Sequence, residues 1–137
     1  MTAWSGVVSR DHVHRGVELG IGQIGHGKRA GLARMKRGDW LIYYSPRSSL
    51  ESYELLQSFT AIGVVADDEI WQADEGDFKP WRRRVNYVMN ATETPIRPLT
   101  GILAITSFPN WGYQLRRGLL MLSDADFTII QGAMNDR

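Results

Sequence analysis

The glycine-rich residues 22–28, GQIGHGK, form the first arrangement in the chain that could do chemistry. Their glycine and lysine spacing is that of a phosphate-binding P-loop, in which backbone amides and a lysine hold the phosphates. Arg29, however, stands where the magnesium-binding serine or threonine belongs, and no apolar strand runs directly into Gly22. We therefore interpret the match as a chance similarity in a glycine-rich loop and not as the signature of an NTPase. Free amides beside His26 and Lys28, at the start of a predicted helix, could still bind an anion.

The three histidines, His12, His14 and His26, do not have the spacing of a metal site. Helical zinc sites place two histidines at i and i+4 around an acid, and the chain has no cysteine that could add a thiolate ligand. A nucleophile elbow, G-x-S-x-G, is also absent. The sequence therefore predicts no metal, no cofactor and no covalent catalysis.

Aromatic residues offer a different chemistry, the stacking of a planar ligand. Residues 40–44, WLIYY, are too short for a buried helix and end at Ser45-Pro46, so they predict a strand. Alternation along this strand sends Tyr44 to one face and Tyr43 and Ser45 to the other. We take the carboxyl end, Tyr44-Ser45-Pro46, as the part that faces a ligand, and the remainder as core.

Trp111 is the second aromatic candidate. It lies in a predicted loop, residues 108–113, where a large ring has less reason to be buried. Aromatic rings beside arginines commonly hold unstacked bases, since stacking contributes about 1–3 kcal/mol per base. Trp111 therefore either stacks on a base or closes one end of the fold.

The formal net charge of +1 hides a segregation of charges along the chain. The chain has three basic clusters, and a segment of six carboxylates at residues 67–77 lies between the first and the second. The basic clusters are Lys28, Arg29, Arg34, Lys36 and Arg37; Lys79, Arg82, Arg83 and Arg84; and Arg116 with Arg117. If they meet in space with the acids turned elsewhere, they form a cationic face for phosphates; the alternative is a set of solvated loops.

Length and composition indicate one domain, residues 1–137, of the α+β class. Short aliphatic runs are separated by fourteen glycines and five prolines, which suits a β-rich domain better than a helical bundle. No window approaches the roughly 18 apolar residues of a membrane span, and no basic region followed by an apolar one opens the chain. We expect a cytoplasmic protein with no membrane partner.

The predicted elements follow from periodicity and capping signals. Strands are expected at residues 4–9, 40–44, 55–65, 81–88 and 118–122, with a possible extension at 70–72, whereas residues 16–31 are expected to form a long loop. Residues 29–35 predict a short helix with Leu32 and Met35 inward. The last helix has Ser123 as its N-cap and a staple between Leu122 and Phe127.

Many of these blocks, in one order along nearly the whole chain, resemble the bacterial EVE domain. This domain belongs to the PUA-like superfamily, which also contains the YTH readers of methylated RNA. The resemblance rests on Val7-Val8-Ser9, Gln23 with His26-Gly27-Lys28, residues 35–46, Leu56-Gln57, residues 59–63, Phe78-Lys79-Pro80 with Trp81-Arg82-Arg83, Pro95-Ile96, Pro98-Leu99, Trp111-Gly112 and residues 123–127.

The resemblance implies a PUA-like β pseudo-barrel of about six strands with flanking short helices, and a pocket for a nucleobase. The pocket candidates are Ser9, His12, Gln23, His26, Gly27, Lys28, Tyr44, Ser45, Pro46 and Trp111. For the phosphates we expect Lys28, Arg29, Arg82 and Arg83. A full tryptophan cage, as in YTH domains, cannot be read from the sequence.

The expected function is that of a reader, which binds without chemistry and holds a modified base, with modified cytosine as the leading candidate. Its partner would be DNA, RNA or a free nucleotide. Two alternatives stay open. One is a small amidohydrolase acting on acylated nucleosides, similar to the related ASCH domains, using Lys28, Thr60 and Glu18 or Asp39. The other is a small-molecule or protein-interaction module.

Overall fold

The computed structural model describes residues 1–52 and 54–135, and in this part of the chain one mixed sheet carries all the strands. The sheet order is β2-β6-β4-β3-β1-β8, with β5 paired to β6 and β7 paired to β4. The strands are β1 (Ala3–Val7), β2 (Ile21–Gly22), β3 (Trp40–Arg47), β4 (Leu55–Val65), β5 (Trp71–Gln72), β6 (Trp81–Tyr87), β7 (Thr94–Pro95) and β8 (Leu120–Leu122). The sheet curls into a half-barrel, and the predicted α+β pseudo-barrel is confirmed.

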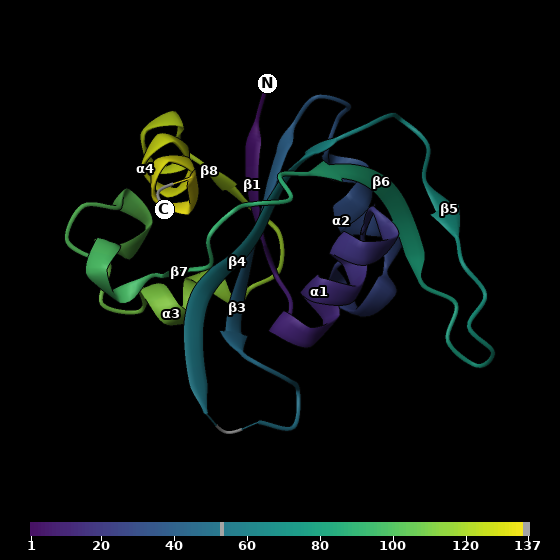
Figure 1. Cartoon of the computed structure of the whole chain (residues 1–137), viewed down its shortest axis with the longest axis horizontal. Coiled ribbons are helices and arrows are strands. Elements are labelled where there is room, and N and C mark those ends of the chain that lie inside the picture. Colours follow the sequence, from purple (N-terminus) through teal and green to yellow (C-terminus); the bar gives the residue numbers. More distant parts are fainter. Residues whose placement is uncertain (53, 136–137) are drawn as a thin grey trace.

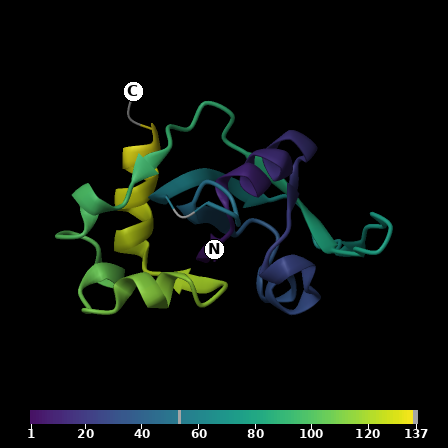
Figure 2. The ribbon, with the colours of Figure 1, turned by 90° about the horizontal axis from the view of Figure 1, so that it is seen from below.

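Short helices cover both faces of this sheet (Figures 1 and 2). The α-helices are α1 (Arg10–Leu19), α2 (Arg29–Arg34), α3 (Trp111–Leu115) and α4 (Asp124–Asn135), and three short 3-10 turns are η1 (Gly25–Gly27), η2 (Arg97–Leu99) and η3 (Ala104–Thr106). Helices α1 and α2 lie on one side, and α3 and α4 lie on the other. No helix in the described residues is long and apolar enough to span a membrane.

The pairing of β1 decides which loops meet. β1 runs parallel to β3, with Val7 opposite Tyr44, and antiparallel to β8, with Ser5 opposite Leu120. The carboxyl ends of β1 and β3 and the amino end of β8 therefore share one edge of the sheet. The start of α1, the β3–β4 connection and the turn before β8 all come together at this edge.

Alternation along the strands divides the buried side chains into two cores. Ile42 and Tyr44 of β3 join a core under α4, together with Phe127, Ile130 and Met134. Leu41 and Tyr43 join the other core, under α1 and α2. The predicted alternation of β3 is thus confirmed, and Leu32 and Met35 point inward as predicted, with 0% and 3% of their surface exposed.

The last helix starts as the sequence predicts. The Ser123 hydroxyl accepts a hydrogen bond from the backbone N–H of Asp126 at 3.1 Å, as expected of an N-cap. The carboxylate of Asp126, however, points to another element, where it accepts hydrogen bonds from the amides of Ala104 and Ile105 at 2.8 and 3.0 Å. Asp126 therefore ties α4 to η3.

Three expectations about the elements need correction. Residues 16–31 are not one long loop, because α1 runs to Leu19 and is followed by β2, η1 and the start of α2. The strand at residue 40 extends through Ser45-Pro46 to Arg47, and its pairing with β4 shifts register between Tyr43 and Tyr44 and again between Ser45 and Arg47. The aromatic loop at 108–113 turns into helix α3 from Trp111 onward, which packs against the core under α4.

Candidate nucleotide-binding cavity

A cavity of about 820 Å³ opens at the shared edge of β1, β3 and β8. Its walls come from the start of α1, from η1, from the tip of the β5–β6 hairpin and from the turn before β8. Small-molecule sites in proteins commonly have volumes of about 300–1,000 Å³. The cavity is therefore large enough for more than a solvent cluster, and it lies where the topology gathers loops from distant parts of the sequence.

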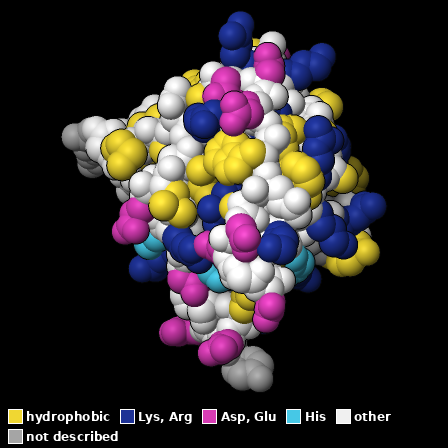
Figure 3. Space-filling model, turned by 90° about the vertical axis from the view of Figure 1, so that its right-hand side faces the viewer, with side chains coloured by type: hydrophobic (Ala, Val, Ile, Leu, Met, Phe, Trp, Pro, Cys, Tyr) yellow, Lys and Arg dark blue, Asp and Glu magenta, His cyan; other side chains and the backbone are white. Residues whose placement is uncertain are grey.

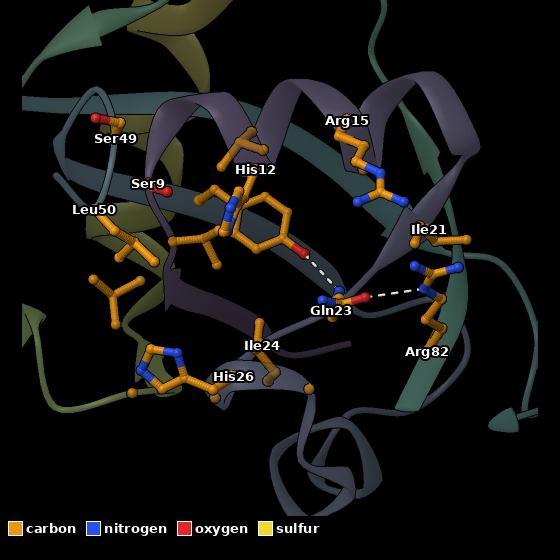
Figure 4. Close-up of a pocket in the computed structure, with 18 of the residues that line it drawn as sticks. Ser9, His12, Arg15, Ile21, Gln23, Ile24, His26, Ser49, Leu50 and Arg82 are labelled. Atoms are coloured by element: carbon orange, nitrogen blue, oxygen red, sulfur yellow. Dashed lines mark hydrogen bonds between the residues drawn. The ribbon is translucent and has the colours of Figure 1, made fainter. Parts of the chain in front are cut away.

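One end of the cavity is a continuous network of polar contacts (Figure 4). The buried Tyr43 hydroxyl accepts a hydrogen bond from the backbone N–H of Gln23 at 3.1 Å. The side-chain oxygen of Gln23 in turn accepts one from Arg82 Nε at 2.9 Å. Arg82 also contacts Glu75 at 3.1 Å, and Arg15 donates to the same carboxylate oxygen of Glu75. Gln23, which directly follows β2, is thus joined to β3, β6, the β5–β6 connection and α1.

This network fixes the charge of Glu75. Burial raises the pKa of its carboxyl, but the hydrogen bond from Arg82 and the positive charges of Arg15 and Arg82 lower the pKa by more, so it lies below its ordinary range. Glu75 is therefore an anion at neutral pH. One of its oxygens is occupied by the two arginines, so the other remains as an acceptor for a ligand.

Three ring side chains line the cavity and leave surface exposed. His12 projects from α1 in the middle of the view in Figure 4, and His26 lies across from it on η1. The third ring is Phe78, at the hairpin tip, with 44% of its surface exposed. Rings with free faces on opposing walls are what a planar ligand needs.

The turn that carries His26 has an unusual backbone. Gly25, His26 and Gly27 all have positive φ angles, of 58°, 57° and 84°. A non-glycine residue in this region is uncommon and costs conformational energy. Gly27 cannot be replaced without a shift, because a Cβ there would lie 2.7 Å from Pro80 Cβ. The flanking glycines therefore let the chain turn tightly against β6 while His26 faces the cavity.

The hydroxyl hydrogen of Ser9 is used within the protein and is not directed into the cavity. The hydroxyl donates to Asp11 Oδ1 at 2.8 Å, and the amide of His12 donates to the same oxygen. Burial raises the pKa of Asp11, but these hydrogen bonds lower it by more, so the pKa lies below its ordinary value. Ser9 can therefore offer the cavity an acceptor oxygen more readily than a donor.

The structure brings seven of the sequence-predicted residues to this cavity. Six come from the predicted pocket and one from the predicted phosphate set: Ser9, His12, Gln23, His26, Gly27, Pro46 and Arg82. These residues are spread along the sequence from Ser9 to Arg82. Their role in binding stays a prediction, and the network around Glu75 was not anticipated.

Tyr44 and Ser45 do not line the cavity. Tyr44 faces the other core, where its ring packs edge-on against Phe59 with centroids 5.7 Å apart. Ser45 is fully buried and donates to the carbonyl of Val8 at 2.6 Å, while its oxygen lies 2.8 Å from the Thr60 hydroxyl. The ring that does face the cavity is Tyr43, because alternation places it with Leu41 rather than with Tyr44.

Trp111, Lys28 and Arg29 also lie elsewhere. Trp111 packs against the core under α4, with the Arg97 guanidinium 5.5 Å from its ring centroid. Lys28 is exposed just before α2 but does not line the cavity. Arg29 lies over the Trp81 ring at 5.7 Å. Trp111 therefore closes one end of the fold, the second of the two roles expected for it.

Arg83 is the largest departure from the phosphate prediction. Only 2% of its surface is exposed, and its guanidinium donates to the carbonyls of Leu32, Met35 and Asp67 at 2.9, 2.6 and 2.5 Å. Burial lowers the pKa of Arg83, although nearby Asp68 and Asp67 oppose this. Arg83 ties α2 to β6 and is not available to a phosphate.

The acidic segment is not turned away from the second basic cluster. Arg84 contacts Asp67 and Glu69 at 3.1 and 3.4 Å, and Lys79 contacts Asp74 at 3.1 Å. Figure 3 shows basic and acidic side chains interspersed on the side of the molecule that carries the β5–β6 hairpin. This cluster is therefore largely neutralised by its neighbours in sequence.

The alternative sets of residues are not assembled in the cavity. Lys28, Thr60, Glu18 and Asp39, considered for an amidohydrolase, are absent from its walls. Asp39 instead accepts hydrogen bonds from Trp4 Nε1, Thr2 N and Lys36 N at 2.9–3.0 Å. The P-loop-like residues form β2 and the η1 turn. Among the described residues no three His, Asp or Glu side chains gather as a metal site.

Several cavity residues were not selected from the sequence. Tyr43, Glu75 and Phe78 are examples, as are Arg15, Arg47, Arg116 and Arg117. The pair Arg116-Arg117 was visible as a basic cluster, but nothing local places it beside α1. For Tyr43 the alternation of β3 was an available signal.

Comparisons with known proteins agree with this architecture. A solved NMR structure from Rhodopseudomonas palustris, Rpa0253, matches with a TM-score of 0.60 over 98% of this chain and 93% of that one; at 14% identity this shows the fold alone. UPF0310 proteins of Renibacterium salmoninarum and Mycobacterium avium are 48% and 47% identical, over 96% and 99% of this chain and 94% and 99% of their own.

The EVE domain model matches residues 2–133. This family generally has a PUA-like fold of the nucleic-acid-binding kind. With nearly the full length matched, the chain belongs to the EVE-domain family.

Proposed function

We propose that the protein binds nucleic acid or a nucleotide by taking an unstacked base into the cavity, and that it reads a modified cytosine there without chemical change. The observation that carries this proposal is the combination, in one cavity, of exposed rings on opposing walls and a fixed polar network at one end. The rings supply stacking that accepts any base. The network supplies hydrogen-bonding groups that distinguish one base edge from another.

The side chains of the network are held in fixed positions, which supports selective recognition of one base over binding of any base. Gln23 is held at its backbone by Tyr43 and at its side-chain oxygen by Arg82, so its NH₂ group remains to donate to the ligand. Glu75 is held by Arg15 and Arg82 and keeps an oxygen free to accept. Groups fixed in advance lose little conformational entropy on binding.

Cytosine fits this donor and acceptor pair. Its exocyclic amino group donates, and carboxylates accept from it in known recognition contacts. Its ring nitrogen and carbonyl accept, which suits the Gln23 amide. A uracil or thymine presents a carbonyl in place of the amino group, and that carbonyl would face the Glu75 carboxylate. The cavity volume of about 820 Å³ leaves room for a substituent on the base.

The test is a titration of the protein with single-stranded oligonucleotides that differ at one base. The probes carry cytosine, a 5-substituted cytosine or uracil at the centre, and fluorescence anisotropy is measured at two salt concentrations. We expect tighter binding of the substituted cytosine than of either other base. Equal affinity for all three would contradict the reader proposal.

A matched pair of variants locates the binding. His12 and His14 both project from α1, but His14 lies 2.7 Å from Glu93 and outside the cavity. His12→Ala should weaken binding about 10-fold, equivalent to the loss of one stacked ring. His14→Ala should leave it within about twofold. A loss of the same size in both would show that the cavity is not the site.

A further inference from the structure

The cavity has two ends of different electrostatic character, and the difference lies in how its five arginines are paired. Arg15 and Arg82 share Glu75 at the network end. The other three, Arg47, Arg116 and Arg117, have no acidic side chain within ion-pair distance in the described part of the chain. Uncompensated cations at a cavity wall raise the local concentration of anions.

Topology explains why these three arginines line the same cavity. Arg47 ends β3, and Arg116 and Arg117 follow α3 in the turn that leads into β8. Since β1 is parallel to β3 and antiparallel to β8, the end of β3 and the start of β8 flank the end of β1. In Figure 4 the yellow-green ribbon before β8 passes beside His26, at the end of the cavity opposite Gln23 and Arg82.

Two of the three guanidinium groups, those of Arg47 and Arg117, are held by neutral partners. Arg47 donates to the carbonyl of Ser52 at 3.3 Å, and Arg117 donates to the side-chain oxygen of Gln114 at 3.1 Å and lies 6.0 Å from the ring centroid of Tyr113. Arg116 and Arg117 are exposed at their side chains. Neutral partners orient an arginine while leaving its charge and most of its donors for a ligand.

We propose that Arg47, Arg116 and Arg117 form a phosphate subsite, and that it orients the ligand with its phosphate at this wall and its base edge at Gln23 and Glu75. The proposal rests on the proposed base-binding function. It replaces Arg82 and Arg83 as the principal phosphate contacts, because Arg82 is paired with Glu75 and Arg83 is buried. The shared chemistry is a phosphate ester, from an internal position of a strand or from the end of a free nucleotide.

The first experiment measures how affinity depends on salt. Each phosphate contact to a single strand contributes about 0.7 to the slope of log affinity against log salt concentration. In the variant Arg116→Gln/Arg117→Gln the slope should fall by about 1.4, while the ratio of affinities for substituted cytosine and uracil stays unchanged. The control is Arg37→Gln/Arg84→Gln, which removes the same charge from exposed residues outside the cavity and should leave the slope within about 0.3. Equal slopes in the wild type and in Arg116→Gln/Arg117→Gln, the cavity variant, would contradict the proposed phosphate subsite.

The second experiment is independent of base recognition. Inorganic pyrophosphate is titrated into the wild-type protein, and amide chemical shifts are recorded. We expect saturable shifts at residues 116–118 and at Arg47, and their loss in the cavity variant. If pyrophosphate produces them but no oligonucleotide binds selectively, the base-reading function fails and the anion subsite stands. No saturable shift would overturn the subsite even if the oligonucleotides bind.

A third comparison separates the two sources of phosphate. Cytidine 5′-monophosphate and a trinucleotide with cytidine at its centre and no terminal phosphate are compared with free cytidine. Both should bind more tightly than cytidine if the wall accepts any phosphate ester. A gain for one alone identifies the source, and no gain for either contradicts the proposal.

Discussion

The two faces of the sheet differ in how they are closed, although the same strand, β3, supplies side chains to both. Under α4 the core is continuous and apolar, and Ile130 and Met134 lose all their exposed surface. Under α1 and α2 the core is smaller, has the buried Arg83 hydrogen-bonded to its members Leu32 and Met35, and borders the open cavity. The twelve-residue α4 covers its face, whereas the shorter α2 and the turn η1 leave a gap on the other. We infer that one face holds the fold together and the other is free to bind.

The largest effect should come from a truncation on the closed face. Ile130→Ala removes a fully buried side chain from α4 and should lower the free energy of unfolding by about 2–5 kcal/mol. Ligand affinity of the folded protein should stay within about twofold. Urea denaturation and anisotropy measure the two quantities. A large loss of affinity in a folded variant would show that the faces are not independent.

The second largest effect on stability should come from replacing Arg83, the buried charged residue on the cavity face. Arg83→Met removes the Arg83 donor from the carbonyls of Met35 and Asp67 and one of two donors from the carbonyl of Leu32, so it should cost about 2–3 kcal/mol of stability. Arg84→Met, at its exposed neighbour, should cost less than about 1 kcal/mol. Urea denaturation of both variants checks this. Similar costs would mean that the hydrogen bonds of Arg83 are not structural.

The dependence of stability on pH should reveal Asp39, which anchors the start of β3. Burial raises the pKa of Asp39, but hydrogen bonds from Thr2, Trp4 and Lys36 lower it by more, so the folded pKa lies below the ordinary value. Its contribution is therefore present above about pH 4 and is lost as pH falls through the folded pKa.

The measurement is the free energy of unfolding between pH 6 and pH 2. Asp39→Asn should cost about 1–3 kcal/mol at neutral pH and should make the stability less dependent on pH below about pH 4. If the stability of Asp39→Asn falls as steeply as that of the wild type between pH 6 and pH 2, Asp39 does not cause the pH dependence.

The smallest and most direct comparison uses two adjacent tyrosines on opposite faces. Tyr43→Phe removes the acceptor for the Gln23 amide and should cost about 1–2 kcal/mol of stability and also weaken ligand binding. Tyr44 packs in the other core against Phe59, away from the cavity, so Tyr44→Phe should change stability by less than about 0.5 kcal/mol and leave binding unchanged. Thermal unfolding and anisotropy compare the pair; the reverse order would contradict the assignment of faces.

Much of the fold could be predicted from local patterns. The β4 strand has the bounds expected for residues 55–65, and Ser123 caps the last helix as predicted. Gly63 lies within the strand at a point of close approach, since a Cβ there would lie 2.8 Å from the carbonyl oxygen of Asn86. These features depend on neighbours in sequence or on period, which a single chain displays directly.

The site was less accessible to such reasoning. Ser9, His12, Gln23 and His26 were selected and do line the cavity, because they lie in or beside one chain segment that the resemblance marked. Arg83 was selected for its charge, but charge alone does not show that three backbone carbonyls surround it. Tyr44 was selected over Tyr43 because alternation defines two faces without saying which one has a gap.

By itself, then, the sequence determined the α+β class, the alternation of β3 and the capped last helix. Tertiary structure alone decided that the ends of β1, β3 and β8 share one edge, and so that Arg47, Arg116 and Arg117 line the same cavity. The physical reason is distance along the chain. Periodicity and capping act over a few residues, whereas strand pairing joins segments far apart in the sequence, such as Val7 with Tyr44 and Ser5 with Leu120.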